Sequence, residues 1–335
     1  MNTPIHFAFS IWFLIYLQSA YASSQAFLDS GYPGGRLAKR LVPRTSRSAC
    51  PGLNTLANEG FLPKSGHLIT AAKITVACFR GFGLSPETCA FIVLSGLRSA
   101  SLSSASVFSL HDVDRSTWQI QHTRSLSRED IISPPFPFAP PQSTSLFQQR
   151  PWNVALRAMH QCKQGRRELI NADCFGRARA ARIRDRGLPY DESAATHGAV
   201  ETARIMLVLG DENGAELKYI ESVFVHERLP THLGWKRKEY SGGVNAMLDA
   251  AVQTQQADII LRCPTGGGRV ATRWDLLNAF TSYRGFFLNG KVKILLKLSG
   301  FNNQTIFDTL NEIAAEKRRG QIFQADEDPN ECSQR

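Results

Sequence analysis

The sequence lacks a long apolar run beyond Ala22: no later stretch reaches the roughly 18 uninterrupted apolar residues that a transmembrane helix needs. It has no internal repeat, and Gly266-Gly267-Gly268 is not followed by the lysine and hydroxyl residue of a phosphate-binding loop. With 335 residues, 43% of them apolar, the chain can bury a large core, which excludes disorder of the whole chain. One large globular domain or two ordinary ones remain.

Acidic residues are also in short supply, 29 against 39 Lys and Arg, which gives a net charge of +10. The largest share lies between Arg157 and Arg186, where nine basic residues face three acids. Such a stretch could bind nucleic acid. However, five of its arginines alternate with Ala and Ile in a helix-prone run: Arg177, Arg179, Arg182, Arg184 and Arg186. We therefore predict a solvated helix face and no nucleic-acid partner.

The amino terminus has the pattern of a secretory signal peptide. Phe7 to Leu17 is apolar and too short to span a bilayer comfortably, and Ala20-Tyr21-Ala22 matches the small-x-small cleavage pattern. We expect cleavage after residue 22, secretion, and no membrane association of the mature chain. An uncleaved anchor is the alternative, because no Lys or Arg precedes the apolar run.

Seven cysteines in an oxidising compartment leave one over after pairing. Cys50 precedes Pro51, which suits the first position of a helix, so Cys50 is predicted to be an N-cap. Backbone N–H groups and the helix dipole would lower the pKa of its thiol there, which suits a nucleophile or a metal ligand. The alternative is an ordinary small residue or half of a disulfide.

The other cysteines offer candidate pairs whose connectivity the sequence cannot decide. Cys78 and Cys89 lie near the end of one predicted helix and the start of the next, where a bridge and two buried thiols are equally compatible. The remaining candidate pairs are Cys162–Cys174 and Cys263–Cys332.

Four blocks of sequence carry a resemblance to a known family. They are, in chain order, Ala49 to Pro63, Gln121 to Arg128, Val200 to Thr202 and Glu227 to Trp235. In order and approximate spacing they resemble the fungal haem-thiolate peroxidases, the family of chloroperoxidase and the unspecific peroxygenases. The resemblance runs from about Arg47 to Trp235.

The resemblance implies haem b with Cys50 as the axial thiolate ligand of its iron, because the family's proximal cysteine has that role. Electron donation from such a thiolate favours cleavage of the O–O bond of peroxide. Glu201 matches the acid–base group above the haem, and an apolar helix around it would favour its acid form; a solvent-facing glutamate is the alternative. His122 matches a histidine that hydrogen-bonds this glutamate. His111-Asp112 is rejected for that role because no Ser-x-Ser-Arg follows it.

The sequence also departs from the family pattern. Gln121 replaces a glutamate that, with the position of Ser125, helps to hold a divalent cation beside a haem propionate. A neutral amide is a poorer partner for Mg²⁺ or Mn²⁺ than a carboxylate, so retention of that cation is in doubt. Thr123 replaces the aspartate that orients the histidine, and Ala49 replaces the first proline of the family's Pro-Cys-Pro motif.

Helix caps and apolar spacing predict a mainly α-helical scaffold, and the resemblance implies the single-domain chloroperoxidase-like fold. Predicted helices cover residues 71–80, 86–96, 153–160, 168–186, 196–209, 219–227, 244–254, 272–283 and 305–319. We divide the chain into a signal peptide (1–22), an N-terminal extension (23–46), a haem-thiolate peroxidase core (47–240) and a C-terminal helical extension that packs on the core (241–335). Asn303-Gln304-Thr305 is an N-glycosylation acceptor.

The resulting hypothesis is a secreted, monomeric haem-thiolate peroxidase or peroxygenase. It would use hydrogen peroxide to oxidise or oxygenate a small organic substrate, or a halide, with tailoring of a secondary metabolite as one role. Two other classes stay open: a degenerate haem-binding protein with little turnover, suggested by Gln121 and Thr123, and a secreted binding module without haem. Candidates for lining the channel above the haem, each with core packing as the alternative, are Phe79, Phe82, Phe91 and Phe108.

Overall fold

The computed structural model describes residues 45–114, 125–129, 146–186, 190–239, 243–263, 271–283 and 286–323. The predicted signal peptide, the Pro-rich segment from Ser133 to Ser143 and the glycines at 266–268 lie outside these residues. Residues 45–335 cluster as one compact unit.

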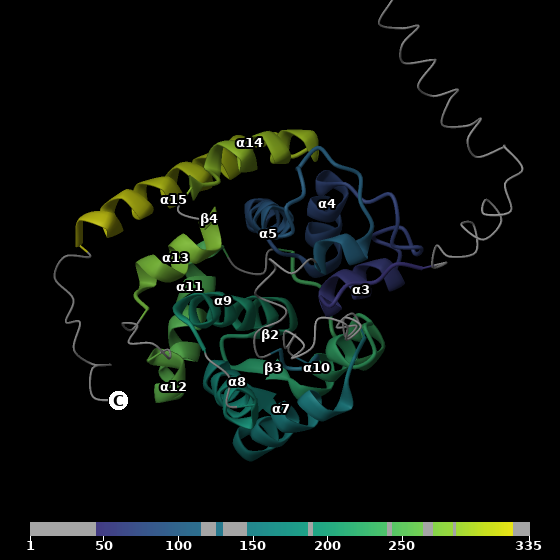
Figure 1. Cartoon of the computed structure of the whole chain (residues 1–335), viewed down its shortest axis with the longest axis vertical. Coiled ribbons are helices and arrows are strands. Elements are labelled where there is room, and N and C mark those ends of the chain that lie inside the picture. Colours follow the sequence, from purple (N-terminus) through teal and green to yellow (C-terminus); the bar gives the residue numbers. More distant parts are fainter. Residues whose placement is uncertain are drawn as a thin grey trace, which may run out of the picture. The chain divides into compact units, whose positions relative to one another are not determined.

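The fold is mainly α-helical, as predicted (Figure 1). The first half contains α3 (Pro51–Asn58), α4 (Ala71–Phe82), α5 (Pro86–Ser99), the 3-10 helix η1 (Leu110–Asp114), α7 (Gln149–Cys162), β1 (Leu169–Ile170), α8 (Ala172–Arg186) and α9 (Glu192–Leu209). The second half contains β2 (Gly210–Asp211), β3 (Gly214–Glu216), α10 (Leu217–Phe224), η2 (Pro230–Leu233), α11 (Val244–Gln256), α12 (Ile259–Arg262), α13 (Arg273–Thr281), β4 (Ser282–Tyr283), β5 (Phe286–Phe287), α14 (Asn289–Leu298) and α15 (Gln304–Phe323). The short strands form an antiparallel sheet in the order β1-β3-β2 and an antiparallel pair β4-β5.

Local capping chemistry sets several helix bounds. The Thr70 side chain accepts a hydrogen bond from the Lys73 N–H and starts α4, which ends before Gly83 in the left-handed region (φ 73°). Two predicted bounds are wrong because a glutamate leaves the helical conformation. Glu168 (φ 51°) lies before β1 rather than inside α8, and Glu227 (φ 50°) lies beyond the end of α10.

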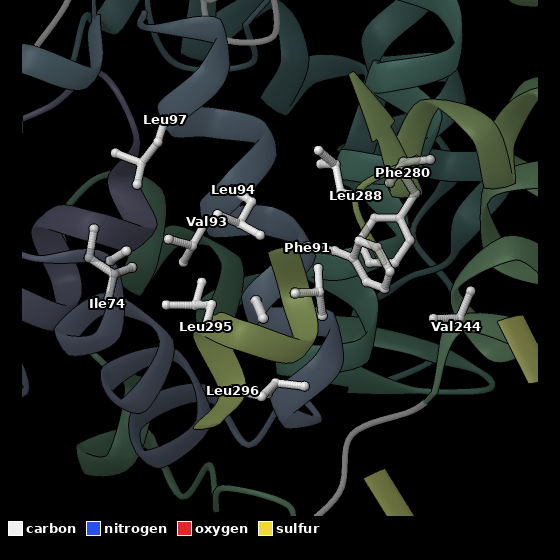
Figure 2. Packing of buried hydrophobic residues seen from close by; sticks show 14 of the residues in the cluster. Ile74, Phe91, Val93, Leu94, Leu97, Val244, Phe280, Leu288, Leu295 and Leu296 are labelled. Carbon is white, nitrogen blue, oxygen red and sulfur yellow. The ribbon is translucent and has the colours of Figure 1, made fainter. Parts of the chain in front are cut away.

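The helix α9 is surrounded by other helices and positions the candidate site. It packs against α8, α11 and α13, while α7 packs on α8, and α4 packs on α5 (Figure 1). One apolar cluster joins α4, α5, α9, α11, α13, α14 and α15. Figure 2 shows part of it, in which the rings of Phe91 and Phe280 meet with centroids 5.3 Å apart. A second cluster joins α7, α8, α10 and the other side of α9.

Disulfides link neighbouring helices. Cys78–Cys89 joins α4 to α5, and Cys162–Cys174 joins α7 to α8, so two of the pairings left open by the sequence are present. Cys263 is also disulfide-bonded, and its proposed partner Cys332 lies outside the described residues.

The prediction that the basic stretch is a solvated face is wrong for two of its arginines. Arg179 and Arg182, on the inner side of α8, are 3% and 0% exposed, whereas Arg177 and Arg184 point outward and form exposed ion pairs. The sequence did not show which arginines are buried, because basic residues occur on both faces of the helix. Positions three apart, such as 179 and 182, share one face. Among the described residues, no helix has both the length and the apolar character needed to cross a membrane.

Candidate functional site

Cys50 is the free cysteine of the described chain and the N-cap of α3. Its backbone is extended (φ −77°, ψ 109°), and Pro51 occupies the first helical position, as predicted from the sequence. The sulfur therefore lies at the positive end of a helix that begins with no acidic residue.

The expectation of a lowered thiol pKa is wrong for this protein in the absence of a cation. Burial raises the pKa of Cys50 to about 11, and the negative charges of Glu201 and Asp114 act in the same direction. The backbone N–H groups of Leu53 and Gly52 lower the pKa, but they do not offset the loss of solvation. A thiolate here therefore needs a bound cation to be stable at neutral pH.

A hydrogen-bond network fixes the loop that carries Cys50. The Ser48 hydroxyl donates to Asp114 Oδ1 (2.6 Å) and accepts from the Cys50 N–H (3.1 Å), while the Ala49 N–H donates to Asp114 Oδ2 (2.7 Å). Asn54 closes the loop from inside α3, accepting from the Ser48 N–H (2.9 Å) and donating to the Ser48 carbonyl (2.7 Å). Asp114 was not singled out from the sequence, although it positions the loop directly before the cysteine.

Glu227 extends this network to the rest of the chain. Its Oε1 accepts from Asn54 Nδ2 (2.7 Å) and from the buried Arg128 guanidinium (2.5 Å). Three segments that are widely separated in sequence thus meet in one hydrogen-bond network beside the loop that carries the sulfur. They are the segments around Cys50, Arg128 and Glu227. The left-handed backbone of Glu227 is part of this arrangement.

Cys50 lines an apolar cavity of about 190 Å³ that is partly open to solvent. Its ionisable wall groups among the described residues are Cys50, Glu201 and Arg204. The remaining wall is almost entirely apolar and comes mainly from α3, α4, α5, α9 and α10: Leu53, Leu56, Ile74, Phe82, Leu84, Ile92, Val93, Leu97, Val113, Ile205, Val208, Leu209, Val223 and Phe224. Such a wall accepts a large flat apolar group and keeps water away from it.

Glu201 lies in the wall of the same cavity, on α9. Its Oε2 accepts a hydrogen bond from Arg179 Nη2 (3.0 Å), and the Arg179 side chain is 4% exposed. Burial raises the pKa of Glu201, while Arg179 and Arg204 act against that rise. The direction agrees with the expectation that the acid form is favoured.

Gly198 makes room for the Arg179 guanidinium. A Cβ at this position would lie 2.3 Å from Arg179 Cζ, which is far inside any real contact. Arg179 can therefore cross the backbone of α9 and reach Glu201 only because residue 198 has no side chain. Neither residue was singled out from the sequence, since the contact joins two helices and needs a gap that no motif encodes.

The structure places the other predicted residues as follows. Ser125 accepts hydrogen bonds from the Ser127 and Arg128 N–H groups (3.4 and 3.2 Å), and Gln121 and His122 lie outside the described residues. No group of three or more His, Cys, Asp or Glu side chains within the described ranges could hold a metal ion. Of the four candidate channel phenylalanines, Phe82 lines the cavity, Phe91 and Phe108 are core residues, and Phe79 packs on Phe301.

The donor set fits a haem with a thiolate ligand. A free cysteine sulfur at a helix N-terminus faces an apolar cavity, its loop is fixed by hydrogen bonds, and the half-buried carboxylate of Glu201 lies in the same wall. The raised pKa of Cys50 belongs to a thiol without a cation, and iron would supply the missing positive charge.

Comparison with known proteins gives two findings. The family model for peroxidase, family 2, matches residues 39–240, more than half of the chain. An aromatic peroxygenase from Coprinellus radians is 44% identical over 52 residues, which cover 16% of this chain and 20% of the relative. The chain thus matches only a fifth of that relative's length. The mainly helical fold, the free cysteine of the proximal block and the extent of the family match show that this chain belongs to family 2 of the peroxidases, whose members are peroxide-using oxidoreductases.

Proposed function

We propose that this protein is a haem-thiolate peroxidase or peroxygenase that uses hydrogen peroxide to oxidise a small organic substrate. The observation that supports this most strongly is the position of Cys50 and Glu201 in the wall of one apolar cavity. Cys50 would hold haem b through its thiolate. The haem supplies the redox chemistry that cleaves the O–O bond of peroxide and transfers its oxidising power to a substrate.

The protein's own residues would control the proton and the solvent. Arg179 holds Glu201 Oε2, which leaves Oε1 to accept a proton from hydrogen peroxide and return it to the departing oxygen. Burial raises the pKa of Glu201, which favours a carboxyl that can return a proton after accepting it. The apolar wall excludes water, and the network through Ser48, Asn54 and Asp114 keeps the sulfur in place.

The cellular context of this function is also a proposal. The N-terminal segment predicts export, and the Cys78–Cys89 and Cys162–Cys174 bridges suit an oxidising compartment. Asn303 is exposed directly before α15, so it would be accessible to glycosylation. The apolar cavity suits a small organic substrate such as a secondary metabolite, and halide oxidation is the alternative reaction. We propose that the protein acts as a monomer.

Glu201→Gln tests the catalytic assignment. We expect the variant to retain haem, measured by its Soret absorption, and to lose peroxide-dependent oxidation by roughly 10²–10⁴-fold, because general acid–base catalysis is removed. Glu192→Gln is the matched control, since Glu192 is an exposed glutamate in the first turn of the same helix.

Three outcomes would contradict parts of the proposal. Unchanged turnover in Glu201→Gln removes Glu201 from the mechanism. A wild-type protein that binds haem but does not use peroxide is a haem carrier, and a wild-type protein without Soret absorption is a binding module of another kind.

A further inference from the structure

Arg204 is a half-buried cation for which the described residues provide no hydrogen-bond acceptor. It lines the cavity from α9, and its Nε is buried without a hydrogen-bond partner. Its one defined contact is with the face of Phe280, where Cζ lies 5.3 Å from the ring centroid. The face of an aromatic ring attracts a guanidinium, but it does not accept the directional N–H hydrogen bonds that a carboxylate accepts.

The nearby carboxylate of Glu201 does not accept a hydrogen bond from Arg204. Glu201 lies one helical turn before Arg204, but its hydrogen bond goes to Arg179 from α8. Two guanidinium groups thus lie near one carboxylate. Arg179 is hydrogen-bonded to it, and the charge of Arg204 beside the cavity has no hydrogen-bonded partner among the described residues. Burial lowers the pKa of Arg204 to about 10, although the charges of Glu201 and Cys50 act against this, so the group remains a cation at neutral pH.

A cation that is partly removed from water and has no acceptor is destabilising, and a ligand that supplies an acceptor removes that cost. The complement of a guanidinium is a planar carboxylate, which accepts two parallel hydrogen bonds. The rest of the wall is apolar. A complementary ligand therefore has one carboxylate and an apolar body.

We propose that Arg204 is the carboxylate-binding residue of this cavity and that the substrates of the enzyme are small organic acids with an apolar body. This rests on the proposed peroxidase function, whose substrate class it specifies. Arg204 and Glu201 are three residues apart on α9 and therefore lie on one face of the helix. A carboxylate held by Arg204 places the apolar body of the same molecule in the cavity beside the acid–base group.

A haem propionate offers the same carboxylate chemistry, so the experiment must separate the two sources. The test uses calorimetric binding of phenylacetic acid and of phenylacetamide to the haem-loaded protein. We expect the acid to bind about 10- to 100-fold more tightly than the amide, because a hydrogen-bonded charge pair is replaced by a neutral contact. Arg204→Met should abolish this preference, and Arg204→Lys should retain part of it.

Arg237→Met is the matched control. Arg237 also lies over an aromatic ring, that of Phe79 at 5.9 Å, but it is exposed and outside the cavity wall. It should keep the preference for the acid. Arg204→Met should also melt at the same temperature as the ligand-free wild type or higher, because a partly desolvated charge without an acceptor is removed. A residue with a purely structural role would lower that temperature.

Two results would overturn the proposal. The first is equal binding of acid and amide by the wild type. The second is an Arg204→Met variant that shows either of two behaviours. In one, it keeps the acid preference, which removes Arg204 from substrate binding. In the other, it loses affinity for haem while it binds haem dimethyl ester as the wild type does, which assigns Arg204 to a haem propionate. If the purified protein holds no haem, the peroxidase function is contradicted, and the same titrations on the haem-free protein still test the acid preference that is assigned to Arg204.

Discussion

At the scale of single residues, the site depends on the partners of two charged groups on α9. Glu201 is held by Arg179, and Arg204 faces the cavity without an acceptor among the described residues. Arg179 and Arg204 differ in their partners for a steric reason. Gly198 leaves room for the Arg179 guanidinium to cross the backbone of α9, whereas Arg204 extends from α9 into the cavity wall. The missing side chain at Gly198 thus decides which of the two arginines is paired with the Glu201 carboxylate.

Arg179→Met should move the acid limb of the pH–rate profile to higher pH. Arg179 holds the pKa of Glu201 down against burial, so its removal lets that pKa rise further. Because Glu201 must be ionised to accept a proton, activity should then disappear at a higher pH as the solution is acidified. The measurement is kcat/KM for peroxide as a function of pH, together with the carboxyl infrared band that is absent in Glu201→Gln.

Arg177→Met is the control for this prediction. Arg177 lies on the same helix and forms an exposed ion pair with Asp173 (2.7 Å), so its loss should leave the profile unchanged. If Arg179→Met gives the wild-type pH profile and the wild-type carboxyl band, Arg179 does not set the protonation of Glu201.

At the scale of elements, α15 is fastened to α13 by a lysine in an apolar setting. Lys317 Nζ donates to Asn278 Oδ1 (2.7 Å) and to the Ser282 hydroxyl, and it lies 4.7 Å from the centroid of the Phe287 ring. The Lys317 carbonyl accepts from Trp274 Nε1 (3.0 Å). The polar contacts orient α15 on α13, while Ile306, Leu310 and Ile313 bury its apolar face.

The stability of the protein should contain a contribution from Lys317 that rises with pH. Burial lowers the pKa of Lys317 from 10.5 to about 8. Between about pH 8 and 10.5 the unfolded chain therefore binds more protons at this residue than the folded one, and the free energy of unfolding increases with pH. Urea unfolding at pH 7.5 and pH 10 should show this increase in the wild type and less of it in Lys317→Met.

The exposed Lys293, which lies over the Phe307 ring, provides the control for this measurement. Lys293→Met should show the same change between the two pH values as the wild type. An identical pH dependence in Lys317→Met and the wild type would mean that Lys317 is solvated in the native protein.

Local signals predicted some of the elements whose ends are made by side chains. Thr70 capping α4 and Pro51 opening α3 are examples, whereas the Asp191 cap of α9 and the Asp258 cap of α12 were missed. The helix α14 was missed because it begins after Leu288 without a capping side chain, and its lysines interrupt the apolar spacing. Glu168 and Glu227 were placed inside helices, since no local signal shows that distant partners hold their backbones in the left-handed region.

At the scale of the whole molecule, the sequence singled out Cys50 and Glu201 as candidate site residues but did not predict their surroundings. Cys50 and Glu201 stand in recognisable local patterns, and the structure brings both to one cavity. Asp114 and Arg179 became visible only through contacts across 65 and 22 positions of the chain. Arg204 did carry a signal, because it is the one basic residue in the segment from Val200 to Leu209, which the hypothesis had interpreted only as a mostly apolar helix.

The most direct test of the haem-thiolate assignment is the carbon monoxide difference spectrum of the reduced protein, recorded for the wild type and for Cys50→Ala. We predict that the wild type shows the long-wavelength Soret band of ferrous haem bound by a thiolate, and that Cys50→Ala lacks it because no other described cysteine is free to take its place. A thiolate-type band that persists in Cys50→Ala, or a wild type without it, would contradict the assignment of Cys50 as the iron ligand.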